Sequence, residues 1–508
     1  MRLKSVRIKN FRCYEDSGEI SIDALTAFVG KNDVGKSTVL EALDIFFHNG
    51  KGVVSIDKDD VDKNVEVKEF SVICSFDELP DSLVLDSSYE TTLAAEYLTN
   101  SHGCLEVEKV FGASKLLKTF IIANHPTHPK CCDLLSLRNK DLKKILSDCH
   151  ITCENQSINA VIRKAIRDNF AVELDCQMQS IDVSKGDDVK TIWGNLEDSL
   201  PIYSLFRSDR ENSDSDDEVQ NPLKACAKEI LADPSMRAKL AGIAGEVLTA
   251  LSEVATHTYE KLAEMAPAVA AGLVPKVPAA EDLKWADVFK GVTISGVDDI
   301  PINKRGSGVK RLVLLNFFRA EAERLHAPNR GIIYAIEEPE TSQHSEHQAL
   351  LVDALKRLSG REGVQVLITT HSSIIVKGLG YDSLRLVKKT DTGRQVGRVQ
   401  GQVLKYASMI EASYLAFEEA SVEYHDQLWA VLDGEKKLPA FRSGKPLMPY
   451  FRPDKFDASG RPKNEPRILS HYIRDQIHHP ENTLNTRFTE VQLKQSIEDM
   501  RAFLVANP

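Results

Sequence analysis

The 508-residue chain is 42% hydrophobic and 27% charged, an ordinary composition for a globular protein with room for two or three domains. Its net charge of −11 excludes a surface coated evenly in basic residues, but it is compatible with a local basic patch. The charged N-terminus lacks the apolar segment of a secretory signal, no apolar run reaches about 18 residues, and the nine cysteines are scattered. These features predict a cytoplasmic protein with reduced thiols and no membrane contact.

The N-terminal lobe, residues 1–125, is predicted to combine strands with one helix. Alternating apolar and basic residues, or short apolar runs, predict strands at residues 3–8, 20–22, 25–29, 65–76 and 104–110. The helix is expected over 36–47, directly after a glycine-rich turn.

Residues 126–284 are predicted to form a mainly helical insertion. An acidic, polar stretch at 208–220 is typical of an exposed linker, and the Ala-, Leu- and Glu-rich stretch 222–265 has helical spacing. A strand-and-helix pattern then resumes over 285–400, with strands at 331–336, 364–368 and 384–387 and helices at 311–325, at 345–358 and after His371.

The C-terminal part, 401–508, is expected to be helical around a Pro-rich basic loop at 439–466. The predicted fold class is therefore α/β: one mixed-sheet head, split by a mainly helical insertion and followed by a helical C-terminal region.

The strongest motif is GKNDVGKST at Gly30–Thr38, which fits GxxxxGK[ST] between a predicted strand and a predicted helix. Its backbone N–H groups and the helix N-terminus would bind phosphate, a contact shared by Gly30, Asn32, Val34, Gly35 and Thr38. Lys36 would contact the β- and γ-phosphates, and the Ser37 hydroxyl would bind Mg²⁺. The alternative is a glycine turn that matches by chance.

A second motif, GIIYAIEEPE at 331–340, is an apolar strand that ends in carboxylates. Such a strand delivers acids to one sheet edge, so Glu337 is expected to help hold Mg²⁺ and Glu338 to orient and deprotonate the attacking water. A strand capped by solvated acids is the alternative.

Two weaker motifs complete the set. His371 follows the next apolar strand, where it could sense a γ-phosphate, and Ser307 and Gly308 precede a helix, where they could bind an anion. The alternative for His371 is a structural histidine, and the alternative for Ser307 and Gly308 is a glycine turn with a helix cap.

The four motifs in this order resemble the ABC-type ATPases of the SMC, RecF and OLD kind, over about 1–125 and 285–390. The stretch from Ile8 to Arg12 is similar to that family's first strand, which places Arg12 near the nucleotide. Glu337 stands where many members have Asp, and the loop after Glu340 keeps only the histidine (His344) of the Leu-His-Pro sequence of the OLD branch.

The resemblance implies ATP hydrolysis with Mg²⁺ in a homodimer or a larger homo-oligomer of dimers. Ser307 and Gly308 of one subunit would close over ATP bound at Lys36 of the other. It also implies that ATP holds the dimer together and that hydrolysis releases it.

The C-terminal region carries two further patterns. Nine Lys/Arg against three acids lie between Lys436 and Arg467, interleaved with four aromatic residues, which is compatible with nucleic-acid binding or with a solvated loop. Arg474 and His479 match the Rx₄H pattern of HEPN ribonucleases, and a structural helix end is the alternative. No Glu-Gly and Asp-x-Asp pattern follows residue 390, so no TOPRIM nuclease is predicted within the chain.

The leading hypothesis is an ATPase that acts as sensor and scaffold and controls a separate HNH or TOPRIM nuclease in bacterial anti-phage defence. The layout resembles the ATPase subunits of Septu, of its retron-associated relatives and of PARIS. The alternatives are an ATP-controlled HEPN-like ribonuclease acting through Arg474 and His479, and a RecF-like DNA-repair ATPase.

Overall fold

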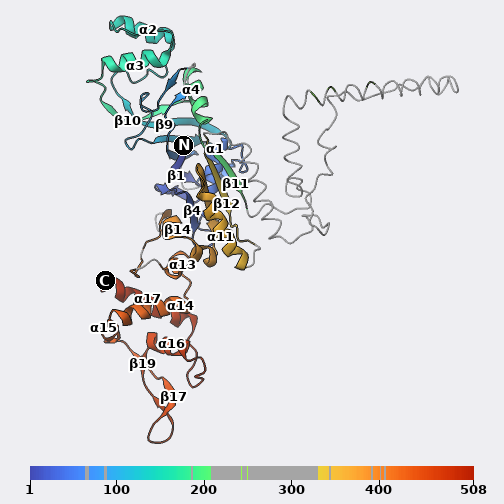
Figure 1. Cartoon of the computed structure of the whole chain (residues 1–508), viewed down its shortest axis with the longest axis vertical. Helices are drawn as coiled ribbons and strands as arrows, with labels where there is room; N and C mark the ends of the chain where they lie inside the picture. The colour runs from blue at the N-terminus through green and yellow to red at the C-terminus, as the bar shows by residue number, and fades with distance from the viewer. Residues whose placement is uncertain are drawn as a thin grey trace, which may run out of the picture. The chain divides into compact units, whose positions relative to one another are not determined.

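The computed structural model describes residues 1–62, 68–84, 89–184, 187–207, 330–341, 345–390, 393–400, 402–405 and 408–508, together with Lys239, Gly242 and Thr249. The chain divides into two compact units, one formed by Met1–Ser208 with His326–Pro508 and the other by Asp209–Leu325. Nearly all of the described residues belong to the first unit (Figure 1). Apart from Lys239, Gly242 and Thr249, the predicted helices at 222–265 and 311–325, and the pair Ser307–Gly308, lie outside the described residues.

The first sheet is antiparallel and has the strand order β10-β9-β8-β5-β1-β2, with β3 paired to β1. Its strands are β1 (Arg2–Phe11), β2 (Tyr14–Asp16), β3 (Ile20–Ser21), β5 (Phe70–Asp77), β8 (Leu105–Phe111), β9 (Leu116–Pro126) and β10 (Cys176–Asp182). In β8 every second side chain is buried, as expected for a strand with one face against a core.

The second sheet has the order β11-β12-β13-β4-β14-β15 and is parallel except for its last strand. It is built from β4 (Leu25–Val29), β11 (Ile202–Phe206), β12 (Ile332–Glu337), β13 (Val364–Thr370), β14 (Leu384–Thr390) and β15 (Gly393–Arg398). Every residue of β4 and β12 is buried, which explains why these strands are continuous apolar runs.

One hydrophobic core joins the two sheets. It contains residues of both sheets and of helix α1 (Lys36–His48), which packs on β11 and β12 as well as on β1 and β5. Helices α11 (Ser345–Ser359) and α12 (Ser373–Gly378) pack against each other, and α11 lies on β13 and β4. The predicted α/β class with a mixed sheet is confirmed.

Both sheets take a strand from beyond residue 126, the predicted start of the insertion. β10 completes the antiparallel sheet and β11 forms an edge of the parallel sheet, although both lie beyond residue 126. Their sequences are polar or short, so periodicity alone did not predict them. Between them, α2 (Asn139–Asp148) and α3 (Asn159–Asn169) form a small core of their own, and α4 (Asp187–Glu197) precedes β11.

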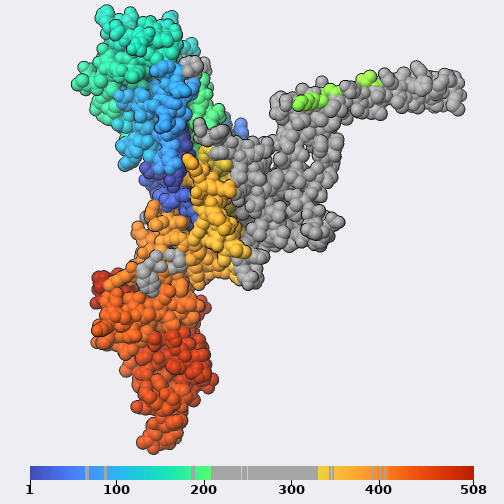
Figure 2. Space-filling model, in the orientation of Figure 1, coloured from blue at the N-terminus to red at the C-terminus, as the bar shows by residue number. Residues whose placement is uncertain are grey.

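The C-terminal region has a separate hydrophobic core around Trp429. Its helices are α13 (Met409–Phe417), α14 (Val422–Gly434), α15 (Leu438–Arg442), α16 (Leu469–His478) and α17 (Glu490–Ala506). The basic loop between α15 and α16 holds short strands, β16 (Leu447–Met448), β17 (Phe451–Phe456), β18 (Pro462–Asn464) and β19 (Arg467–Ile468). Figure 2 shows the β17–β18 hairpin as a narrow extension of this region.

No helix in the described part of the chain combines the length and the apolar surface needed to cross a bilayer. The eight cysteines that the structure describes are all free thiols, as expected.

Candidate ATP-hydrolysis site

The glycine-rich turn connects the C-terminal end of β4 to the start of α1. Gly30 has φ 146° and Gly35 has φ 101°, backbone conformations that side chains disfavour. A Cβ on Gly30 would lie 2.6 Å from the carbonyl oxygen of Val387, and one on Gly35 would lie 2.7 Å from Cys13 Sγ. Only glycine fits at both positions, so the turn can wrap closely around a ligand.

Lys36 lies inside this turn and is only 6% exposed. Its ammonium group donates hydrogen bonds to the carbonyl oxygens of Gly30 (3.0 Å) and Lys31 (2.8 Å). Burial lowers the pKa of Lys36, while the negative charges of Glu338, Glu340 and Asp33 act in the opposite direction. The ammonium group therefore interacts electrostatically with the acids after β12, which lie some 300 residues away in the sequence.

The turn also offers donors for phosphate. Within the part of the chain that the structure describes, the backbone N–H groups of Lys31, Asn32 and Asp33 donate no hydrogen bond that meets the usual geometric limits. Free N–H groups in a glycine-rich turn next to a helix N-terminus form a site for a phosphate chain. The residues present therefore fit ATP.

The acidic strand end is placed by the sheet register. Glu337 is the last residue of β12 and pairs with Thr369 of β13, whose next residue, Thr370, pairs with Val29 of β4. The strand end with Glu337 and the strand end with the turn therefore meet at one edge of the parallel sheet, as the carboxyl ends of parallel strands must.

Glu338 begins the turn after β12 in a strained conformation. Its φ of 41° lies in the left-handed region, and its N–H donates to the carbonyl oxygen of Thr369 (3.0 Å). A non-glycine residue held in this way is typical of functional sites, since surrounding structure must stabilise the strain. The Glu338 side chain is 29% exposed, so water can reach its carboxylate.

His371 follows β13 and joins the same group. Its Nδ1 lies 3.5 Å from Glu338 Oε1 and 3.6 Å from Glu340 Oε1. The sequence analysis gave Glu338 a role but gave Glu340 none, because the partners of Glu340 come from β13 and not from its own motif.

Arg12 has other partners than the nucleotide. Its guanidinium forms ion pairs with Asp60 (2.7 Å) and with Glu41 of α1. Although burial alone would lower the pKa of Arg12, these two carboxylates raise it. In this structure Arg12 braces the first helix, and nucleotide binding by Arg12 stays a prediction.

Two contacts to the turn had no signal in the sequence. The Tyr14 hydroxyl donates to the carbonyl oxygen of Gly35 (3.0 Å), and the Arg394 guanidinium on β15 donates to the carbonyl oxygen of Asp33 (3.1 Å). Both side chains hold the glycine-rich turn from outside, so they support the site without belonging to its motif.

The other predicted residues of the glycine-rich turn and the start of α1 differ in their exposure to solvent. Asn32 is exposed, Val34 and Ser37 are half-buried, and Thr38 is buried. Ser37 and Glu337 supply the hydroxyl and carboxylate oxygens that Mg²⁺ prefers, and this ion usually completes its shell with phosphate and water. Within the described residues no three His, Cys, Asp or Glu side chains gather as a metal cluster, which agrees with so sparse a set of protein ligands.

The family assignment follows from a comparison with known families. A family model described as "AAA ATPase domain" matches residues 1–376, more than half of the chain. The chain belongs to the AAA ATPase domain family. It is an ATPase, and the prediction of ATP binding is confirmed at this level.

Individual relatives are short or distant matches. The OLD nuclease of Thermus scotoductus is 49% identical over 43 residues, which cover 8% of this chain and 8% of that nuclease. The SMC head domain from Thermotoga maritima is similar at 13% identity and a TM-score of 0.31, over 79% of this chain and all of that one. An SmcHead bound to the C-winged helix domain of ScpA is similar at 14% identity and a TM-score of 0.37, over 78% of this chain and 97% of that one.

Arg474 and His479 are not brought together by α16. The Arg474 guanidinium lies over the ring of Trp429, 5.5 Å from its centroid, whereas His479 lies 3.3 Å from Glu481 and is exposed. His478, one turn after Arg474, pairs with Asp426 at 3.2 Å. A ribonuclease pair at 474 and 479 therefore stays a prediction without a contact to support it.

Most cations of the basic segment lie next to a carboxylate, and three of them share Glu465. Six of its nine cations pair with acids: Lys437, Lys445, Arg452, Lys455, Lys463 and Arg467. Of its four aromatic side chains, Phe441 and Tyr450 are core residues, while Phe451 and Phe456 are exposed. The composition of this segment thus overstates its basic surface.

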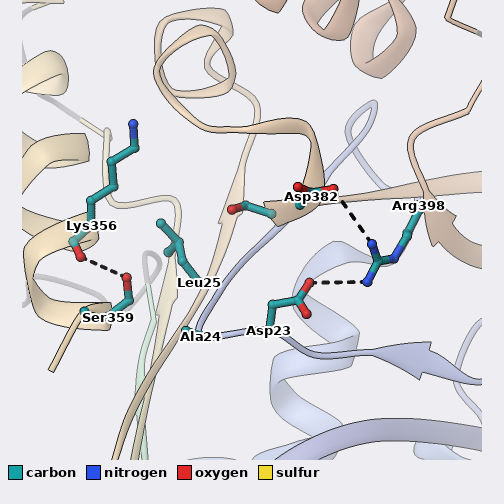
Figure 3. Close-up of a pocket in the computed structure, with 9 residues that line it drawn as sticks. Asp23, Ala24, Leu25, Lys356, Ser359, Asp382 and Arg398 are labelled. Carbon is teal, nitrogen blue, oxygen red and sulfur yellow. Dashed lines mark hydrogen bonds and ion pairs between the residues drawn. The ribbon is translucent and has the colours of Figure 1, made fainter. Parts of the chain in front are cut away.

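Two hollows in the described surface lie away from the candidate site. One, of about 660 Å³, is lined by Asp23, Leu25 and Lys356 at the start of β4, with Arg398 reaching Asp23 and Asp382 (Figure 3). It occupies the edge of the sheet opposite to the glycine-rich turn.

Proposed function

We propose that this ATPase binds ATP with Mg²⁺ between two copies of the chain and uses the bound state to control a separate nuclease in anti-phage defence. The observation that carries the proposal is the meeting of Lys36 with the acidic end of β12 at one sheet edge. That arrangement joins a phosphate-binding turn to carboxylates placed to orient water.

Each residue has a distinct task. Lys36 exchanges its bonds to the carbonyl oxygens of Gly30 and Lys31 for phosphate oxygens. Ser37 and Glu337 hold Mg²⁺, which neutralises phosphate charge when bound. Glu338, half-open to water, orients and deprotonates the attacking water molecule, and His371 contacts the γ-phosphate.

The dimer is proposed because each motif occurs once in the chain. Ser307 and Gly308 would complete the site of the partner subunit, so both sites of a symmetric pair would be shared. Glu338→Gln is expected to form a stable dimer with ATP but not with ADP, measured by light scattering after size exclusion.

A mixing experiment tests the sharing. Lys36→Ala and Ser307→Arg should each be inactive alone, and their equal mixture should regain about a quarter of the wild-type rate, because half of random dimers are mixed and each has one intact site. If the mixture stays inactive while both variants dimerise, the shared site is wrong and the ATPase activity remains.

Control of a nuclease rests on the short match to an OLD nuclease. The test combines the purified ATPase with an HNH or TOPRIM nuclease encoded beside it and measures DNA cleavage. Cleavage should change with Lys36→Ala or Glu338→Gln. Equal cleavage with wild type and both variants would remove the proposed control.

A further inference from the structure

Glu340 is a buried acid that no step described so far uses. It is 4% exposed and lies in the turn after β12, two residues beyond Glu338. Its Oε1 accepts hydrogen bonds from the Thr370 hydroxyl (2.7 Å) and from the backbone N–H of His371 (3.1 Å). The carboxylate therefore ties the end of β12 to the end of β13.

The second carboxylate oxygen of Glu340, Oε2, lies in a different environment from the first. Oε2 is buried and accepts no hydrogen bond from the residues that the structure describes. A buried carboxylate is costly unless nearby positive groups balance it. The groups that face it are the Lys36 ammonium and the imidazole of His371.

The imidazole of His371 is orientated by carboxylates on one side. Its Nδ1 lies at similar distances from Glu338 and Glu340, 3.5 and 3.6 Å. Because the two ring nitrogens point in different directions, a ring with Nδ1 towards the acids presents Nε2 elsewhere. The His371 side chain is 48% exposed, so a ligand can reach the ring.

We propose that Glu340 is a positioning residue for ATP hydrolysis: its carboxylate holds the backbone of His371 and keeps Nδ1 of the ring turned inward, so that Nε2 meets the γ-phosphate. This inference rests on the proposed role of His371. It differs from a structural brace, because it requires the negative charge of Glu340 and not only its hydrogen bonds.

Glu340→Gln separates the two roles. A glutamine amide oxygen can still accept from Thr370 and from the His371 N–H, but it carries no charge to attract the ring. We expect kcat to fall about 10- to 100-fold, as is typical when a residue that orients a functional histidine is replaced. ATP affinity and melting temperature should be nearly unchanged. The matched control is Glu362→Gln, an acid at the opposite sheet edge, which should keep the wild-type rate.

A double-mutant cycle identifies the path of the effect. If Glu340 acts through His371, the variant with both Glu340→Gln and His371→Ala should be no slower than His371→Ala alone. Losses that multiply would overturn the proposal, and so would a wild-type rate in His371→Ala. In either case, loss of hydrolysis in Lys36→Ala would show that the ATP site itself stands.

A measurement without nucleotide gives an independent readout. In ¹⁵N-histidine-labelled protein, the ring signals of His371, assigned by their absence in His371→Ala, report which nitrogen carries the proton. These signals should move in Glu340→Gln and stay in place in Glu362→Gln. Unchanged His371 signals in Glu340→Gln would overturn the proposal even if the rate falls.

Discussion

The candidate ATP site and the C-terminal region differ in how their charged side chains are brought together. At the sheet edge, Lys36, Glu338, Glu340 and His371 come from strand ends that are distant in sequence, and parallel pairing brings them together. In the basic segment, most charged side chains find partners nearby in the chain, as Arg452 does with Asp454. Charges that are close together in the sequence thus form local ion pairs on the surface, whereas charges that are distant in the sequence meet at the candidate site.

The physical cause is the geometry of the sheet. Parallel strands deliver whatever follows their carboxyl ends to one edge, so short motifs after apolar runs are informative across hundreds of residues. An exposed hairpin has no such constraint, and its lysines and arginines pair with any acid within reach. Sequence motifs therefore predict the sheet-edge site better than composition predicts the charge of an exposed hairpin.

The largest expected effect removes the central cation of the sheet edge. Lys36→Ala should lower ATP hydrolysis by at least about 100-fold, since it deletes a buried positive group that we propose contacts the phosphates. Lys356→Ala, which removes a lysine from the hollow at the opposite edge, is the matched control and should keep its rate. Release of phosphate by a coupled assay measures both, and normal turnover in Lys36→Ala would mean that the site is misassigned.

The strands and helix that build this site were predicted closely from the sequence. Residues 25–29 form β4 as expected, the helix after the glycine-rich turn starts at Lys36, and β12 and β13 lie within two residues of their predicted bounds. The three strands are largely apolar runs, and each of the four segments has a glycine next to one end, so their type and one of their ends are marked in the sequence.

What the sequence did not predict depends on tertiary contacts. Glu340 lies inside a recognised motif, but its hydrogen bonds to Thr370 and His371 exist only because β12 and β13 are neighbours. Tyr14 and Arg394 hold the turn from two other strands. Strands β10 and β11 were missed for a related reason, since pairing with neighbours stabilises them more than their own periodicity does.

A second prediction concerns a buried histidine in the C-terminal region. His425 Nε2 lies 3.0 Å from the Ser496 hydroxyl, and its Nδ1 is buried without a hydrogen-bond partner among the described residues. Burial, together with the positive charges of Arg474 and His478, lowers the pKa of His425 to about 4 from 6.5. Because the folded pKa is the lower one, the stability that His425 provides is present above pH 6.5 and is lost as pH falls towards 4.

The free energy of unfolding is expected to fall by about 3 kcal/mol across that window, because each unit of pKa shift corresponds to about 1.4 kcal/mol. Urea unfolding measures it, followed by tryptophan fluorescence in a background with Trp193→Phe and Trp285→Phe, which leaves Trp429 in the same core as the only reporter. His425→Gln keeps a donor for Ser496 but does not titrate, so its stability should fall less between pH 7 and pH 4.5. Equal pH dependence in both proteins would contradict the buried neutral state of His425.

The smallest expected effect concerns two lysines of the basic segment that already have an acid as partner. Lys455 and Lys463 both pair with Glu465 on an exposed hairpin, so the double change to Ala should alter the free energy of unfolding by less than about 1 kcal/mol. It should also weaken any affinity for nucleic acid no more than slightly, because Glu465, which both lysines share, offsets part of their positive charge. Fluorescence anisotropy with labelled single-stranded DNA and RNA measures that affinity.

Arg442 and Arg474 provide the contrast within the same region. Both guanidinium groups lie 5.5 Å from the centroid of the Trp429 ring, and neither pairs with an acid in the described part of the chain. If this region binds nucleic acid, Arg442→Ala should weaken binding several-fold and reduce the dependence of log affinity on log salt by about one phosphate contact. Loss of binding in the hairpin variant, with normal binding in Arg442→Ala, would reverse this assignment, because ion pairs on an exposed hairpin would then open to phosphate more readily than arginines stacked on a ring.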